Sequence, residues 1–307
     1  MLSHQIDCYV ALQRAMGFKY RSQNCLLQHF ARYAEKCGDS YVRCQTVLDW
    51  TGLAPSPLQK RNRMLTVRRF SLAMQSEDAR YEVPPADAFG RCIPECKIRH
   101  IFSQDDIDQL LRVSLQLIPA GSIRPFTYMT LFALLSVTGL RISEAIALNL
   151  NDVTEDGLVI NATKFRKDRL VPLHQSTSQA IECYLHHRKQ VAGIKSALFV
   201  SNNSARLPYS TVNSIFLQLV RAIGLRGKPG EPGVCLHDLR HTFAVRSLEQ
   251  CNGSRTEVSR HMTALSTYLG HAHVSDTYWY LQATPALLAQ ISTAQEACYG
   301  GIDNDRS

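Results

Sequence analysis

Apolar residues recur every three or four positions through most of this chain, and that spacing predicts a mainly helical protein. A first helix is predicted behind Ser22, which can cap it; its apolar positions are Leu26, Leu27, Phe30, Tyr33 and Ala34. A second helix is predicted to follow Pro57. A third is predicted from Ser103 through Leu111, because Ser103 with Asp106 three residues later resembles a capping box.

The middle of the chain combines a buried helix with two short strands. The apolar run from Phe126 to about Val137 predicts a helix, which Gly139 ends. Residues 158–160 and 170–173 predict strands, and the polar stretch 163–169 between them is typical of the tip of a β-hairpin. We therefore expect one small antiparallel sheet in an otherwise helical protein.

The remaining sequence predicts helices joined by loops, and one stretch divides the chain in two. Helices are expected from about Ser176 to Glu296, with the clearest break at residues 227–233. Near residue 84, two adjacent prolines and a glycine cannot continue a helix and therefore indicate a linker. The fold class is thus mainly α (α+β). The expected parts are an N-terminal helical domain at 1–82, a linker at 83–98, a second domain at 99–298 and a polar tail at 299–307.

Charge adds a candidate partner to this picture. The 307 residues carry a formal net charge of +8, with a pI near 9.0, and such an excess favours an anionic partner, most commonly nucleic acid. A basic protein without such a partner is the open alternative. The predicted helix after Pro57 is either a solvated face or a face that follows DNA phosphates, and we favour the second. Its basic residues, with no acid among them, are Lys60, Arg61, Arg63, Arg68 and Arg69.

Composition also speaks against a membrane protein and a zinc protein. No stretch reaches the roughly 18 apolar residues needed to cross a bilayer, and the N-terminus lacks the marks of a signal peptide. A cytoplasmic location in a bacterium is therefore expected. The ten cysteines include no close C-x-x-C pair; Cys92 and Cys96 come nearest. Reduced, mostly buried thiols are the favoured interpretation.

Two segments place charged residues where a purely structural role explains them poorly. Arg141 comes directly after the buried apolar run and must find an anion, which Glu144, one helical turn later, could supply as a simple ion pair. On a predicted helix, His237 and Arg240 are three residues apart and share a face, an arrangement that suits a phosphate.

Two further segments are ambiguous by themselves. Lys164 lies at the predicted hairpin tip, where a lysine is ordinarily a solvated surface residue. His271 closes a Leu-Gly-His triplet, and Tyr278 and Tyr280 follow it closely.

Together, the four segments resemble the tyrosine recombinase (phage integrase) family. That family has an arginine in T-G-L-R-x-S-E, a hairpin lysine before a K-x-R-x-V-P-L strand, H-x-x-R, L-G-H, and a tyrosine nine residues after the last histidine. All six positions are filled here, by Arg141, Lys164, His237, Arg240, His271 and Tyr280. The resemblance covers roughly residues 99–297. The stretch before His271 is longer than usual, with residues 249–256 as the expected extra loop.

The resemblance implies a role for each of these side chains in phosphoryl transfer on DNA. Arg141 and Arg240 would clamp the free phosphate oxygens. Lys164 would protonate the leaving 5′-oxygen, His237 would exchange the proton of the nucleophile, and His271 would donate a hydrogen bond to the phosphate.

The same resemblance makes Tyr280 the nucleophile of a covalent 3′-phosphotyrosyl intermediate. Tyr278, two residues earlier, is the rival nucleophile, and the nine-residue spacing favours Tyr280. Glu144 is expected to orient Arg141 or a neighbouring histidine. No metal or other cofactor is expected, because the sequence shows no cluster of carboxylates suited to a two-metal nuclease.

The implied function is site-specific recombination that integrates, excises or resolves DNA, plausibly within a mobile element. The N-terminal domain fits the family's core-binding (SAM-like) domain in size and position. Double-stranded DNA is the expected partner, bound by a tetrameric synapse on two sites. A helix predicted after Thr284-Pro285, apolar at Leu287, Leu288 and Ile291, would dock on a neighbouring subunit or on its own domain. The alternatives are a type IB topoisomerase-like enzyme and a non-catalytic DNA-binding accessory protein.

Overall fold

The structure is a computed structural model that describes residues 2–90, 99–161, 168–190, 196–251, 255–270, 273 and 277. Across these residues the chain forms eleven α-helices, one short 3-10 helix and a three-stranded antiparallel sheet. The mainly helical class predicted from the sequence is therefore confirmed. The chain divides into two compact units, Met1–Lys97 and Ile98–Ser307.

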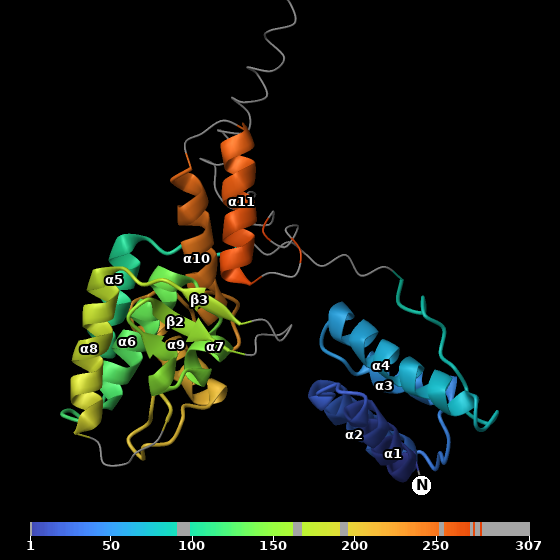
Figure 1. Ribbon diagram of the computed structural model, residues 1–307. Helices are drawn as coiled ribbons and strands as arrows, with labels where there is room; N and C mark the ends of the chain where they lie inside the picture. Colours follow the sequence, from blue (N-terminus) through green and yellow to red (C-terminus); the bar gives the residue numbers. More distant parts are fainter. Residues whose placement is uncertain are drawn as a thin grey trace, which may run out of the picture. The chain divides into compact units, whose positions relative to one another are not determined.

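The N-terminal unit packs four described helices around one core (Figure 1). They are α1 (Leu2–Ala15), α2 (Arg21–Lys36), α3 (Cys44–Gly52) and α4 (Pro57–Gln75). Trp50 of α3 is fully buried in this core, and its indole N–H donates a 2.8 Å hydrogen bond to His29 of α2. This buried aromatic centre fixes α3 against α2.

Side-chain capping starts α4, whereas tertiary packing starts α2. The predicted start of α4 is confirmed: Ser56 caps the helix by accepting from the Gln59 N–H, and proline occupies its first turn. The prediction that Ser22 caps α2 is wrong, because the helix already begins at Arg21. Tyr20 precedes it in a left-handed conformation, and its ring packs edge-on against that of Tyr9.

The C-terminal unit is built around α6 (Arg124–Thr138), whose side chains are buried on most of its sides. Helices α5, α8 and α10 pack against it (Figure 1). The helices of this unit besides α6 are α5 (Gln104–Ser114), α7 (Ile142–Ala147), η1 (Leu150–Asp152), α8 (Gln175–Lys189), α9 (Tyr209–Ala222), α10 (Leu236–Glu249) and α11 (Arg255–Leu269). The capping box predicted for α5 is confirmed, with Ser103 and Asp106 bonded reciprocally.

The small sheet has the order β1 (Val153–Thr154), β2 (Gly157–Ile160) and β3 (Arg169–Val171), with both pairings antiparallel. The two predicted strands are confirmed as β2 and β3, which pair from Leu158↔Val171 to Ile160↔Arg169. No sequence pattern predicts β1, because two residues are too few to show an alternation of apolar and polar positions.

Two smaller expectations need correction. The expected extra loop at residues 249–256 is shorter, because Glu249 ends α10 and α11 begins at Arg255. The prediction of mostly buried thiols is wrong for the described cysteines. All of these are free thiols; Cys8, Cys25, Cys37 and Cys183 are exposed, and Cys44, Cys235 and Cys251 are partly exposed. Cys8, Cys25 and Cys183 lie off the apolar stripes of their helices, where a thiol is too small to reach the core, and Cys37 follows the end of α2.

In the part of the chain that the structure describes, no helix combines the length and apolar character required to cross a bilayer.

Candidate active site

Arg141 stands at the junction between α6 and α7, where the chain has just turned at Gly139. Its Nη1 donates to Glu144 Oε1 at 2.9 Å and to the Leu269 carbonyl at 3.3 Å. Its Nη2 donates to the Gly270 carbonyl at 2.9 Å. These contacts anchor the guanidinium, while 28% of the side chain's surface remains exposed to solvent.

Arg240 of α10 is buried and contacts the same Leu269 carbonyl as Arg141. It is only 2% exposed, and it donates to the Gly139 carbonyl at 2.8 Å and to the Leu269 carbonyl at 2.7 Å. A buried guanidinium cannot lose its proton, so such carbonyl acceptors are what make its burial tolerable. Leu269, the last residue of α11, therefore accepts from both arginines and brings two distant segments together.

The side chain of Glu144 is only 8% exposed and accepts four hydrogen bonds. Two come from Arg141, whose backbone N–H donates at 3.0 Å and whose Nη1 donates at 2.9 Å. Two come from Arg169, whose Nη1 and Nη2 donate at 3.2 and 2.8 Å. Burial raises the pKa of Glu144, but the hydrogen bonds and charges of Arg169 and Arg141 outweigh it and hold that pKa below the usual range.

Sequence reasoning gave Arg169 no role in the site. The position was visible only as the arginine of the strand pattern after Lys164, and a strand pattern does not say what a side chain contacts. The structure places Arg169 at the start of β3 with 13% of its side chain exposed.

His237 lies in the first turn of α10, one turn before Arg240, and stays exposed. Although its surface is accessible, the surrounding protein displaces part of the water near the ring, and this desolvation is the first cause that lowers its pKa. The positive charges of Arg240 and Arg99 lower the pKa further, and the negative charge of Asp238 raises it. A histidine with a lowered pKa is neutral near pH 7 and is able to accept a proton.

The start of α10 is held in place by polar contacts that the motifs did not reveal. Asp238 is buried and accepts from the Cys235 backbone N–H at 2.8 Å. Thr242 accepts from the Phe102 backbone N–H at 3.0 Å. Burial is the largest cause that lowers the pKa of the neighbouring His241 to about 4, so this side chain is uncharged at neutral pH. These contacts fix the turn that carries His237.

Three predicted site residues, Lys164, His271 and Tyr280, lie outside the described residues, as does the rival Tyr278. The structure locates their neighbours in the chain. Lys164 falls in the connection between β2 and β3, and His271 directly follows the Gly270 that Arg141 contacts. Their roles remain predictions.

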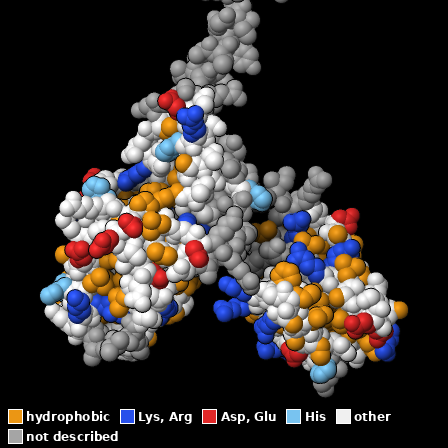
Figure 2. Space-filling model, in the orientation of Figure 1, with side chains coloured by type: hydrophobic (Ala, Val, Ile, Leu, Met, Phe, Trp, Pro, Cys, Tyr) orange, Lys and Arg blue, Asp and Glu red, His pale blue; other side chains and the backbone are white. Residues whose placement is uncertain are grey.

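The five basic residues predicted to bind DNA all lie on α4, but not on one face. Arg63 sits over the Trp50 ring at 4.9 Å and donates to the Trp50 carbonyl, and Arg68 donates to the Pro84 carbonyl. Arg69 is exposed, and Lys60 and Arg61 are partly exposed. Figure 2 shows Lys and Arg side chains interspersed with hydrophobic ones on the N-terminal unit.

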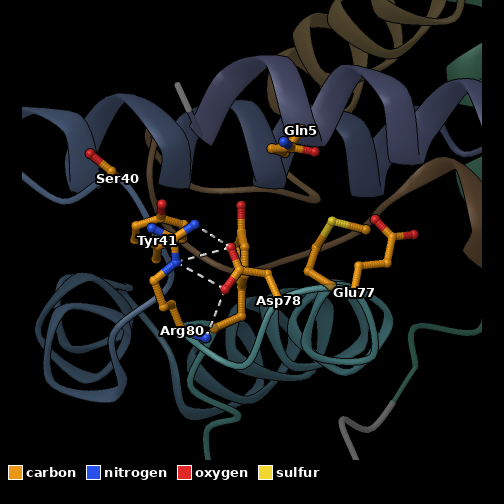
Figure 3. A pocket seen from close by; sticks show the side chains of 8 residues that line it. Gln5, Ser40, Tyr41, Glu77, Asp78 and Arg80 are labelled. Atoms are coloured by element: carbon orange, nitrogen blue, oxygen red, sulfur yellow. Dashed lines mark hydrogen bonds and ion pairs between the residues drawn. The ribbon is translucent and has the colours of Figure 1, made fainter.

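The N-terminal unit also contains a cavity of about 170 Å³ between α1, the end of α4 and nearby loops. Arg80 lies in it, paired with Asp78 at 2.8 Å and stacked on Tyr41 at 4.0 Å (Figure 3). Because Asp78 already neutralises the charge of Arg80, we interpret this cavity as part of the packing of the unit and not as a binding site. Within the described ranges, no group of three His, Cys, Asp or Glu side chains is placed to hold a metal ion.

Residues 100–286 match the sequence model of the phage integrase family, and this match spans more than half of the chain. The chain belongs to the phage integrase family. Its members are tyrosine recombinases, so this recombinase cuts and rejoins DNA strands.

Relatives extend the match over nearly the whole recombinase. The "Putative integrase/recombinase y4rB" of Sinorhizobium fredii is 36% identical over 293 residues, which cover 92% of this chain and 93% of that protein. The tyrosine recombinase XerD of Oceanobacillus iheyensis is 32% identical over 197 residues, 62% of this chain and 60% of that protein.

Solved structures share the fold at lower identity. The XerH site-specific recombinase bound to a palindromic difH substrate has a TM-score of 0.67 and 18% identity, covering 96% of this chain and 85% of that one. The Tn1549 transposon integrase in complex with transposon right end DNA has a TM-score of 0.64 and 17% identity, covering 97% of this chain and all of that one.

Proposed function

We propose that this recombinase performs site-specific strand exchange with Tyr280 as nucleophile, and with Arg141 and Arg240 holding the scissile phosphate. The observation that carries the proposal is the convergence of both guanidinium groups on the Leu269 carbonyl. This carbonyl lies two residues before His271, and Tyr280 follows that histidine by nine residues.

The proposed reaction is an in-line phosphoryl transfer. The Tyr280 oxygen attacks the phosphorus and forms a 3′-phosphotyrosyl bond, while the bond to the 5′-oxygen breaks. His237 accepts the proton of the tyrosine, and Lys164 gives a proton to the leaving 5′-oxygen. In the reverse direction a DNA 5′-hydroxyl attacks the phosphotyrosine and rejoins the strand.

Electrostatic stabilisation would come from the arginines and from His271. Negative charge spreads over the free phosphate oxygens in the transition state, and preorganised guanidinium donors stabilise it. Arg141 suits this role because its carbonyl and carboxylate partners hold it while part of its surface remains open. Glu144 then acts on the phosphate indirectly, by orienting Arg141.

The partner is DNA, and we propose that the functional assembly is a tetramer on two double-stranded sites. The XerH and Tn1549 integrase structures were solved with bound DNA, which supports a duplex partner for a chain of the same fold. The y4rB and Tn1549 relatives support a role in integration, excision or resolution of a mobile element. The work would take place in the bacterial cytoplasm, at the nucleoid, because the DNA lies there.

A nicked suicide substrate that carries the element's own end sequence tests the proposal. The wild type is expected to form a covalent protein–DNA adduct in the presence of EDTA, because no step uses a metal. Tyr280→Phe should abolish the adduct, and Tyr278→Phe should leave it. If Tyr280→Phe formed the adduct at the wild-type level, the nucleophile assignment would be refuted. If EDTA abolished the adduct of the wild type, the metal-free mechanism would be refuted.

A further inference from the structure

Arg169 is joined to the candidate site by an unusually complete ion pair. Both terminal nitrogens of its guanidinium donate to Glu144, one to each carboxylate oxygen, at 3.2 and 2.8 Å. The same carboxylate receives the backbone N–H and Nη1 of Arg141. Glu144 is thus the bridge between an arginine of the sheet and the arginine proposed to hold the phosphate.

Arg169 also lies against the turn that precedes His271. A Cβ atom placed on Gly270 would come within 2.8 Å of Arg169 Nη1 and within 3.5 Å of Arg141 Nη1. Gly270 has a φ of +66°, so a glycine satisfies both the backbone and the close approach of two guanidinium groups. The two arginines therefore occupy adjoining places beside one turn.

Stability alone is a poor explanation of this arrangement. Only 13% of the Arg169 side chain and 8% of the Glu144 side chain are exposed, and removing two charges from water is costly. In addition, Arg169 Nε is buried without a hydrogen-bond partner. Residues with apolar side chains would fill this space without such costs. What the pair provides is geometry: a fork that fixes both carboxylate oxygens in one plane.

We propose that Arg169 is a positioning residue of this recombinase: through Glu144 it sets the orientation of the Arg141 guanidinium toward the scissile phosphate. The inference rests on the proposed role of Arg141. In this proposal Arg169 acts through Glu144, toward which its guanidinium is turned, with one terminal nitrogen on each carboxylate oxygen. The lowered pKa of Glu144 supports it, because the bridging carboxylate stays ionised at neutral pH.

The test compares two suicide substrates that differ only at the scissile phosphate. One carries the ordinary phosphate, and the other carries a methylphosphonate, in which a methyl group replaces one free oxygen and removes the negative charge. On both, attack by the tyrosine breaks the bond to the 5′-oxygen, which leaves as the alcohol. A guanidinium that neutralises the phosphate charge is needed much less on the methylphosphonate.

Arg169→Lys keeps the charge but loses the fork, so it should slow adduct formation on the phosphate on the order of 10- to 100-fold. On the methylphosphonate, the loss of rate caused by Arg169→Lys should be much smaller than on the phosphate. Arg141→Ala should show the same difference between the two substrates. In an Arg141→Ala background, Arg169→Lys should cause no further loss on the phosphate, because the two residues act as one unit. Arg169→Gln should behave as Arg169→Lys does.

Arg188→Lys is the matched control. Arg188 is 8% exposed in the same unit and donates to the Leu198 and Ala197 carbonyls, away from the motif segments. Any loss it causes should be equal on the two substrates. Both rates come from one preparation, so their ratio is independent of how much of a variant is folded.

Two results would overturn the inference while leaving the proposed function intact. One is a wild-type rate for Arg169→Lys on the phosphate. The other is an equal loss on both substrates, which would make Arg169 a structural residue. A wild type that forms no adduct on the phosphate would overturn the proposed function, and with it this inference.

Discussion

Gly139 serves the recombinase twice, as the end of α6 and as a partner of Arg240. Its φ of +60° lies in the left-handed region, and its carbonyl accepts from the buried Arg240 guanidinium at 2.8 Å. A Cβ atom at this position would collide with the ring of Phe243. Gly139 thus allows the chain to turn toward Arg141 and supplies a hydrogen-bond acceptor that positions Arg240.

Gly139→Ala is expected to lower the free energy of unfolding by about 2 to 5 kcal/mol. The left-handed backbone accounts for about 1 to 2 kcal/mol of this loss, and overpacking against Phe243 for about 1 to 3 kcal/mol. Differential scanning calorimetry of the full chain measures the effect as a lower melting temperature. Adduct formation should fall as well, because the carbonyl that holds Arg240 moves.

Gly224→Ala separates the two causes. Gly224 has a φ of +77°, and a Cβ atom there would meet nothing within 4 Å. This variant should therefore lose only the backbone contribution, about 1 to 2 kcal/mol, and keep its activity. If the two variants lost equal stability, the collision with Phe243 would not matter.

The residues of the candidate site differ in how far the sequence could reveal them. Arg141, His237 and Arg240 stand in local patterns, and the structure brings Arg141 and Arg240 together at one carbonyl. Arg169 could not be found in this way, because its importance comes from a contact with Glu144, 25 residues earlier in the chain. The misplaced cap at Ser22 has a similar origin: packing of Tyr20, not local capping, starts the helix.

At the scale of elements, α4 carries the predicted DNA contacts, and its structure divides them. Arg63 and Arg68 hold the unit together through the carbonyls of Trp50 and Pro84. Arg61 is partly exposed and Arg69 is exposed. The sequence predicted where the helix starts and how basic it is. Which arginines make internal contacts depends on tertiary partners, the carbonyls of Trp50 and Pro84.

Arg61→Ala and Arg69→Ala are each expected to weaken binding of duplex DNA and to reduce the salt dependence of the affinity. Each lost phosphate contact should reduce the magnitude of the negative slope of log K against log salt by about 1. Fluorescence anisotropy titrations over a range of salt concentrations measure both quantities, and melting temperatures should stay near that of the wild type.

Arg14→Ala is the control for these variants, because it removes one exposed charge from the end of α1 in the same unit. It should leave the slope unchanged. An equal reduction of the slope's magnitude for Arg14→Ala would show that overall charge, and not Arg61 and Arg69 of α4, attracts the DNA.

At the scale of the whole molecule, the proposed tetramer requires the predicted apolar face of residues 284–291 to dock on a neighbouring subunit. The triple change Leu287→Asp, Leu288→Asp and Ile291→Asp is expected to prevent pairing of two DNA sites and to leave binding to a single site intact. The reason is that charge on an apolar docking face opposes its burial. Native gel electrophoresis with one-site and two-site DNA measures both complexes.

Thr293→Asp places one aspartate away from the predicted apolar face and should pair sites as the wild type does. Normal pairing by the triple variant would contradict docking on a neighbouring subunit. Loss of single-site binding by the triple variant would instead favour a helix that packs on its own domain.

The position of Leu269 at the end of α11 ties catalytic competence to a local folding equilibrium. α11 packs on α10 through a small apolar cluster of its own, apart from the main core, and Leu269 belongs to that cluster while accepting from both arginines. Segments with few buried contacts open at a lower free-energy cost than the whole domain. Heat inactivation of the recombinase should therefore begin with the detachment of this one helix, while α6 and its neighbours are still folded.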